Sequence, residues 1–170
     1  QLNLGYTHYT VGNGLPELRT RIADKLWKEN RIPAKSEEII VTAGAKLAIY
    51  YAVRAMINPG DDVMVLNPGW VSYHAIIKSA GGNAVPVEVK AENHMAIVME
   101  DLEAAWTEKT RMLMINYPNN PTGQILEEVD LQTLCAFMKK HPDLILLSDE
   151  IYERIVFDDR KNLSPASIPD

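Results

Sequence analysis

Residues 112–123 read Met-Leu-Met-Ile-Asn-Tyr-Pro-Asn-Asn-Pro-Thr-Gly, so an unbroken apolar run passes directly into a loop rich in asparagine and proline. Apolar residues that do not alternate with polar ones are typical of a strand buried on both faces, as in a parallel sheet. Asparagine, proline and glycine in succession favour a turn. This stretch therefore predicts a buried strand over residues 112–115, whose carboxyl end opens into a loop over residues 117–123.

The same pattern recurs along the chain. Short apolar runs predict four more strands, at residues 38–42, 63–66, 85–89 and 144–147. Helical spacing and breaker residues predict helices at residues 15–30, 45–57, 71–80, 101–109 and 127–140. Strands that alternate with helices predict an α/β fold with a mainly parallel sheet and helices on both faces, a three-layer α/β/α architecture.

Composition narrows the classes of function. The 170 residues, 46% of them hydrophobic, suit one domain with a real core. A net charge of −6 argues against a nucleic-acid partner, which needs a basic face. No apolar run approaches the roughly 20 residues of a membrane span, and the four histidines show no metal-ligand spacing. The single cysteine excludes an internal disulfide and fits a reducing compartment, so we expect a cytoplasmic protein without a metal.

Polar and glycine-rich residues follow the predicted strands at their carboxyl ends, where parallel sheets bind ligands. The first such place is the turn Gly44-Ala45-Lys46, between a strand and a helix. Free amides at a helix N-terminus favour a phosphate, and glycine lets the backbone turn tightly. The alternative interpretation is an ordinary strand-to-helix turn, and this turn alone does not decide between the two.

Three further side chains follow strands and could carry chemistry. Asp149 follows the last predicted strand and is interpreted either as a solvated helix cap or as the partner of a cationic ligand. Tyr152, three residues on, faces the same way if the segment turns helically. Trp70 follows the strand at 63–66 and is either a stacking platform or part of the core.

Six strings, taken together and in order, resemble the fold-type I pyridoxal-phosphate enzymes, in particular the class I/II aminotransferases of the aspartate and aromatic group. They span nearly the whole chain, at residues 9–19, 41–46, 58–61, 68–73, 116–123 and 148–152. The resemblance implies part of the large, cofactor-binding domain over residues 1–170. It also implies cis peptide bonds before Pro68 and Pro121.

The resemblance assigns a role to each part of the cofactor pyridoxal 5′-phosphate. It implies that Gly44, Ala45 and Lys46 hold the phosphate. It implies that Trp70 stacks on the pyridine ring and that Asp149 pairs with the ring nitrogen, which keeps the ring an electron acceptor.

The remaining implied roles concern the phenolic oxygen of the ring, the substrate and the partner subunit. Asn120 and Tyr152 correspond to the hydrogen-bonding partners of the phenolic oxygen, and Asn120 and Trp70 also border the substrate. Tyr9 corresponds to a tyrosine that reaches the phosphate in the neighbouring subunit. The resemblance therefore implies a homodimer with shared sites.

The activity implied is transfer of an amino group from an L-amino acid to a 2-oxo acid. Another fold-type I enzyme, such as a carbon–sulfur lyase or a cyclopropane-carboxylate (ACC) synthase, is the alternative of the same class. A ligand-sensing aminotransferase-like domain of a transcription regulator and a non-catalytic α/β fragment are alternatives of other classes. The amino donor is not determined, because Gly69 stands where many relatives carry an aromatic residue.

The family's Schiff-base lysine belongs to a string that these residues do not contain, so we expect it beyond Asp170. The N-terminal arm and the C-terminal part are also expected to lie outside the 170 residues. By themselves these residues are expected to be inactive. The resemblance implies that two further strands from beyond Asp170 insert between the strand at 38–42 and the rest of the sheet. The isolated fragment would lack them and expose strand edges, so it is expected to be poorly stable or to aggregate.

Overall fold

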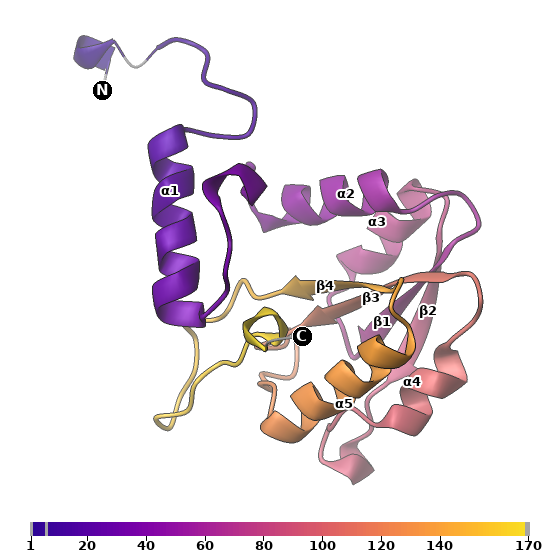
Figure 1. Ribbon diagram of the computed structural model, residues 1–170. Coiled ribbons are helices and arrows are strands. Elements are labelled where there is room, and N and C mark those ends of the chain that lie inside the picture. Colours follow the sequence, from indigo (N-terminus) through magenta and orange to yellow (C-terminus); the bar gives the residue numbers. More distant parts are fainter. Residues whose placement is uncertain (1, 6, 169–170) are drawn as a thin grey trace. The chain divides into compact units, whose positions relative to one another are not determined.

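The computed structural model describes residues 2–5 and 7–168 and divides the chain into two compact units, Gln1–Ala48 and Ile49–Asp170 (Figure 1). Within the described residues, the first unit contains four helical segments. They are η1 (Leu2–Leu4), α1 (Pro16–Lys25), the π-helical η2 (Leu26–Asn30) and the 3₁₀ turn η3 (Ser36–Glu38). Helix α2 (Ala45–Met56) begins in the first unit and continues in the second.

The predicted helix at 15–30 is confirmed as α1 and η2, with Pro16 at the first helical position. Proline suits that position because its missing amide would have no intrahelical partner there. A side chain joins α1 to η3, since the guanidinium Nε of Arg19 donates to the carbonyl oxygen of Ser36 over 2.9 Å.

The strand predicted at 38–42 is wrong, because Glu38 ends η3 and residues 39–42 belong to no helix or strand. A strand needs a neighbouring strand to complete its hydrogen-bond ladder. In the described part of the chain, the four paired strands all lie in the second unit and none pairs with these residues. The Val41 amide donates instead to the Asn13 carbonyl over 3.0 Å. Gly14, at φ +102°, permits this approach, since a Cβ there would lie 2.7 Å from the Val41 side chain.

The second unit is built on a parallel sheet of four described strands in the order β2-β1-β3-β4. The strands are β1 (Asp62–Asn67), β2 (Asn83–Glu88), β3 (Thr110–Asn116) and β4 (Ile145–Asp149). Their register pairs Asn67 with Glu88 and Asn116 with Asp149, so the strands end together at one edge of the sheet. We call this edge the carboxyl rim and the opposite edge the amino rim.

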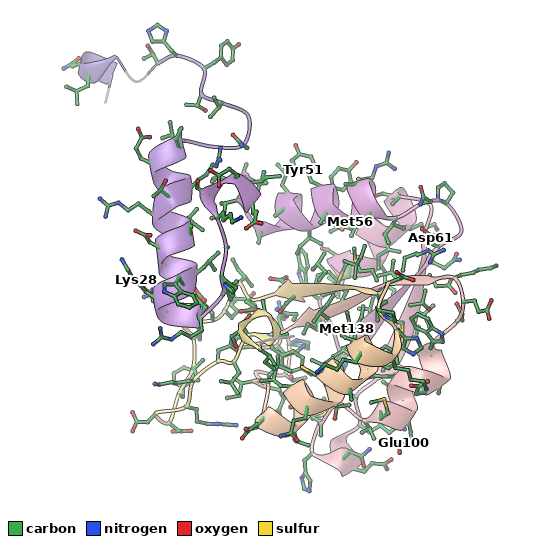
Figure 2. The ribbon with its side chains drawn as sticks, viewed as in Figure 1. Lys28, Tyr51, Met56, Asp61, Glu100 and Met138 are labelled. Carbon is green, nitrogen blue, oxygen red and sulfur yellow. The ribbon has the colours of Figure 1, made fainter. Side chains whose placement is uncertain are left out.

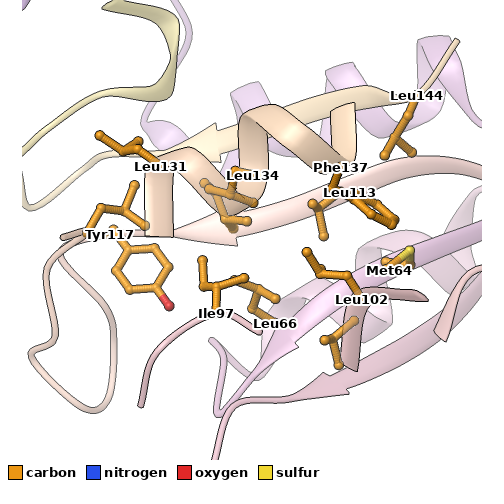
Figure 3. Packing of buried hydrophobic residues seen from close by; sticks show 13 residues of the cluster. Met64, Leu66, Ile97, Leu102, Leu113, Tyr117, Leu131, Leu134, Phe137 and Leu144 are labelled. Atoms are coloured by element: carbon orange, nitrogen blue, oxygen red, sulfur yellow. The ribbon is translucent and has the colours of Figure 1, made fainter. Parts of the chain in front are cut away.

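Helices cover both faces of the sheet, which confirms the predicted three-layer α/β/α architecture (Figure 1). Helices α4 (Met99–Ala105) and α5 (Glu128–Lys140) pack on the face that carries Met64 and Leu113. Figure 3 shows this core, with Leu102 and Phe137 directed at the strands.

The other face carries Val63 and Met114, and it packs against α2 and α3 (Ser72–Ser79). Helix α2 is amphipathic: Val53 is fully buried, whereas Tyr51 lies on the side turned away from the sheet and is exposed (Figure 2). Successive strand residues thus point into the two cores on opposite faces of the sheet, and this explains why the strands are apolar at nearly every position.

Both boundaries predicted for one helix are wrong, since α4 begins at Met99, two residues before the expected start. The helix expected at 101–109 is α4, which ends at Ala105, because Trp106 adopts an extended conformation. The Thr107 hydroxyl then donates to the Asp62 carboxylate over 2.7 Å, and Asp62 is the first residue of β1. The chain after α4 is therefore held to the sheet and does not continue the helix.

The chain winds in two directions from the middle of the sheet. It passes from β1 through α3 to β2 on one face, and from β3 through α5 to β4 on the other face. Right-handed crossovers require such a change of face when the direction reverses. Connections therefore diverge at the carboxyl ends of β1 and β3, the place where open α/β sheets leave a crevice for a ligand. Within the described residues, no helix has the length and apolar character that crossing a bilayer requires.

Candidate functional site

Asp149 is the last residue of β4 and lies at the carboxyl rim with only 9% of its surface exposed. The Tyr73 hydroxyl donates to its Oδ2 over 2.7 Å, and the Ile151 amide approaches its Oδ1 over 3.3 Å. A buried carboxylate is costly unless it is hydrogen-bonded or paired with a cation. Its position and burial argue against the solvated-cap interpretation.

Asn116 organises the rim around Asp149, although the sequence analysis assigned it no separate role. It is the last residue of β3, is 3% exposed, and donates from Nδ2 to the Asp149 carbonyl oxygen over 2.9 Å. Its Oδ1 accepts a hydrogen bond from the Asn120 amide over 2.9 Å. One buried side chain thus fixes both the end of β4 and the start of the loop that follows Pro118.

The loop over residues 117–123 brings Asn120 to Tyr152, where the Asn120 Nδ2 lies 3.4 Å from the Tyr152 hydroxyl oxygen. Asn119 fixes the loop, because its Nδ2 donates to the Pro68 carbonyl over 3.2 Å and its Oδ1 accepts from the Thr122 hydroxyl over 2.8 Å. The loops after β1 and β3 are therefore joined at the switch point of the sheet.

The peptide bonds before Pro68 and Pro121 are cis, as expected, and the bond between Tyr117 and Pro118 is cis as well. The resemblance gave no indication of this third bond. All three lie in the loops that follow β1 and β3.

Trp70 lies after β1 and is partly buried against the core between α2, α3 and the sheet. Its ring meets the Tyr73 ring edge to face, with centroids 5.3 Å apart and planes at 83°. Both interpretations of Trp70 therefore retain support: part of the indole belongs to the core, and part remains accessible beside the residue that holds Asp149.

The predicted phosphate-binding residues lie at the start of α2, in the first unit. Gly44 adopts φ +92°, a left-handed conformation that glycine accepts without strain. Its amide donates to the Thr42 carbonyl over 2.8 Å, and the Thr42 hydroxyl donates to the Gly44 carbonyl over 2.9 Å. Ala45 and Lys46 form the first turn of α2, whose amides point along the helix axis away from its carbonyl groups. Tyr9, in the same unit, is fully exposed.

Four of the predicted residues thus share the carboxyl rim of the second unit, and four belong to the first unit. The rim residues are Trp70, Asn120, Asp149 and Tyr152; the others are Tyr9, Gly44, Ala45 and Lys46. Sequence reasoning did not identify Tyr73 or Asn116 as members of the site. Their positions after β1 and at the end of β3 were a signal, but their partners lie far away along the chain.

The described residues also form a cavity away from the predicted site. A cavity of about 330 Å³ between α5, β4 and the segment that contains Pro165 is mainly apolar, and none of its lining residues is a predicted site residue. In the part of the chain that the structure describes, no group of three or more histidine, cysteine, aspartate or glutamate side chains is arranged to hold a metal ion.

Comparison with known proteins places this geometry in a family. The family model for aminotransferase class I and II matches residues 2–168. The chain belongs to this family. A probable aspartate/prephenate aminotransferase from Aquifex aeolicus is 41% identical over 169 residues, which are 99% of this chain and 43% of that protein.

Solved structures of the family show the same fold. An aspartate aminotransferase from Thermus thermophilus with maleate superposes with a TM-score of 0.92 at 39% identity, covering 98% of this chain and 43% of that one. An aromatic aminotransferase from Pyrococcus horikoshii OT3 gives a TM-score of 0.94 at 40% identity, covering 99% and 45%. The chain therefore spans less than half the length of each of these three relatives.

Proposed function

We propose that the protein containing this chain is a pyridoxal-phosphate-dependent aminotransferase, which transfers the amino group of an L-amino acid to a 2-oxo acid. The proposal concerns the whole protein, because the chain spans only 43% of the Aquifex relative. The observation that carries it is the buried Asp149 carboxylate at the carboxyl rim. Asn116 bonds to the main-chain carbonyl oxygen of Asp149 and to the amide of Asn120, whose side chain contacts Tyr152.

The residues at the rim fit the cofactor. A ring nitrogen that carries a proton needs an acceptor shielded from water, and Asp149 is one. A phenolic oxygen needs donors, and the Asn120 amide and the Tyr152 hydroxyl, 3.4 Å apart, can both donate. An aromatic ring needs a flat partner, and the accessible part of Trp70 provides one.

When bound, pyridoxal phosphate supplies an electron-accepting ring. Within this chain, Asp149 holds a proton at the ring nitrogen by accepting its hydrogen bond. Asn120 and Tyr152 orient the phenolic oxygen, and Trp70 excludes water from one face. Trp70 and Asn120 also border the space for the substrate.

We propose that Gly44, Ala45 and Lys46 hold the cofactor phosphate. The support is local, since the Gly44 turn directs the first-turn amides of α2 outward, and the helix dipole favours an anion there. Such an arrangement would bind the phosphate through backbone amide groups.

We further propose a homodimer in which Tyr9 contacts the phosphate bound to the partner subunit. The full exposure of Tyr9 supports this, because a large aromatic side chain without cover is suited to an interface. A cytoplasmic location is proposed on the single cysteine, which fits a reducing compartment.

The test uses the full-length protein supplied with pyridoxal phosphate, 2-oxoglutarate and a panel of L-amino acids that includes aspartate and an aromatic donor. Formation of glutamate that requires both the donor and the cofactor is the expected result. Formation of pyruvate and ammonia without glutamate would identify a lyase instead. Failure to bind pyridoxal phosphate would refute the proposal altogether.

A further inference from the structure

Tyr73 connects two groups that the proposed function assigns to the cofactor ring. It belongs to α3, and only 1% of its surface is exposed. Its hydroxyl donates to Oδ2 of Asp149 over 2.7 Å, a bond between residues 76 positions apart. Its ring meets Trp70 edge to face. A single buried side chain therefore sets the positions of both groups relative to each other.

The direction of the Tyr73–Asp149 hydrogen bond is fixed. Burial raises the pKa of the Tyr73 hydroxyl far above its ordinary value, and the bond to Asp149 and the negative charge of that residue raise this pKa further. The hydroxyl therefore stays protonated, so it donates and the carboxylate accepts. A short bond from a neutral donor to an ionised acceptor is among the stronger hydrogen bonds in proteins.

The two oxygens of Asp149 differ as a result. Oδ2 is held by the short bond from Tyr73, whereas Oδ1 has the 3.3 Å contact with the Ile151 amide. A carboxylate oxygen can accept more than one hydrogen bond. Both oxygens can accept a further bond, but the contact at Oδ1 is the longer one, so a further donor meets the least competition there. The Tyr73 bond keeps the carboxylate from rotating out of this orientation.

We propose that Tyr73 is a positioning residue for the ring-nitrogen contact: its hydroxyl fixes the Asp149 carboxylate so that Oδ1 accepts the N–H of a protonated pyridine. The inference rests on the proposed function, because it needs a pyridine ligand at the rim. It goes further because the Tyr73 hydroxyl acts on the ligand only through Asp149.

The test compares two ligands that differ only at the ring nitrogen. Pyridoxamine phosphate carries an amine and forms no covalent bond with a lysine; in its 1-deaza analogue, C–H replaces the nitrogen. Both dissociation constants are measured by titration of the full-length apoprotein. We expect Tyr73→Phe to weaken pyridoxamine phosphate binding about 3- to 10-fold, and to leave binding of the analogue within about twofold.

A matched control separates this role from packing. Tyr117→Phe also removes the hydroxyl of a buried tyrosine, but no hydrogen bond joins that hydroxyl to Asp149, so both ligands should bind it as they bind the wild type. Equal weakening of both ligands by Tyr73→Phe would show a structural role only and would overturn the inference. So would unchanged binding of both.

A double-mutant cycle keeps the inference testable if Tyr73→Phe also lowers stability. In the Asp149→Ala background, Tyr73→Phe should cause no further loss of pyridoxamine phosphate affinity, because the two residues act through one contact. Independent, additive losses would contradict the inference. If the wild-type protein binds neither ligand, the proposed function itself fails, and that outcome is distinct from the others.

Discussion

Two buried aspartates lie at opposite rims of the same sheet, and their surroundings differ. Asp62 begins β1 at the amino rim and is 8% exposed; Asp149 ends β4 at the carboxyl rim and is 9% exposed. Asp62 accepts short bonds on both oxygens, from the Thr107 hydroxyl over 2.7 Å and from the Asn83 amide group over 3.0 Å. Asp149 accepts one short bond, from Tyr73.

The comparison shows how one residue type serves two purposes in this fold. Asp62 joins β1, β2 and the segment before β3, and its donors satisfy it within the protein. Asp149 is held on one side and retains acceptor capacity on the other. Burial alone therefore does not identify a binding site; the number of acceptor positions left open at the carboxyl rim does.

The largest effect is expected from exchanging each aspartate for alanine. Asp149→Ala in the full-length protein should lower kcat for amino transfer about 1000-fold or more. The reason is that the carboxylate proposed to face the ring nitrogen of the cofactor is lost. Asp62→Ala should change kcat less than about twofold at a temperature where the variant is folded, since Asp62 lies at the amino rim and makes no contact with the reacting groups. Equal losses of kcat in the two variants would remove the distinction between the rims.

Asn116→Ala tests whether the carboxyl rim depends on its buried organiser. The change removes two hydrogen bonds, to Asp149 and Asn120, so the free energy of unfolding should fall by about 1–3 kcal/mol. Activity should also fall, about 10-fold, because a displaced Asn120 and Asp149 are poorly oriented. Thermal melts and steady-state kinetics on the same preparation measure the two effects. Lower stability with unchanged activity would mean that the site does not depend on the hydrogen bonds of Asn116.

The same Asp62→Ala exchange at the amino rim should lower stability, although it leaves kcat nearly unchanged. Asp62→Ala leaves Thr107 and Asn83 without their shared acceptor, so we expect a loss of about 1–3 kcal/mol in the free energy of unfolding. Chemical denaturation measures it. Unchanged stability together with reduced cofactor affinity would reverse the roles given to the two rims.

The smallest expected effect is on how the free energy of unfolding changes as the pH is lowered. The Thr107 and Asn83 hydrogen bonds lower the pKa of Asp62 below its ordinary value. A carboxyl group whose pKa is lower in the folded state stabilises the fold above the unfolded pKa of about 3.9, and this contribution is lost as pH falls through the folded pKa. Thr107→Val should therefore lose less stability than the wild type between pH 6 and pH 3.

The control for this acid effect is Thr133→Val, which removes an exposed hydroxyl bonded only to the Val129 carbonyl. It should follow the wild-type curve. Burial raises the pKa of Asp130, so the contribution of this residue to the free energy of unfolding increases as pH falls, opposite in sign to that of Asp62. Because all three proteins contain Asp130, comparing their curves separates the effect of Asp62. A Thr107→Val curve that parallels the wild type would show that Asp62 does not link folding to pH.

Much of the fold could be predicted because its signals are local. The strand at 112–115 and the helix at 127–140 follow from runs of apolar residues and from their spacing, and both occur within one or two residues of the expected bounds. The segment 38–42 has an equally apolar run but no partner strand among the described residues. A strand depends on its neighbour, and a run of residues does not reveal whether the neighbour is present.

The site divides in the same way. Asp149, Asn120 and Tyr152 stand in short strings next to strand ends, so their approximate location followed from the sequence. Tyr73 was not assigned a role, because its partner lies 76 residues away and only the packing of α3 against the sheet brings the two together. Asn116 was missed because an asparagine at the end of a strand is typical of a turn. Its role follows only from its two hydrogen bonds in the structure.

The most direct test of the account is the protonation state of the bound pyridine nitrogen. Full-length protein is loaded with pyridoxal phosphate labelled with ¹⁵N in the ring, and the ¹⁵N chemical shift is recorded near neutral pH. The account predicts a shift typical of a protonated ring in the wild type and in Asp62→Ala, and of an unprotonated ring in Asp149→Ala. An unprotonated ring in the wild type, or a protonated ring that Asp149→Ala leaves unchanged, would contradict it.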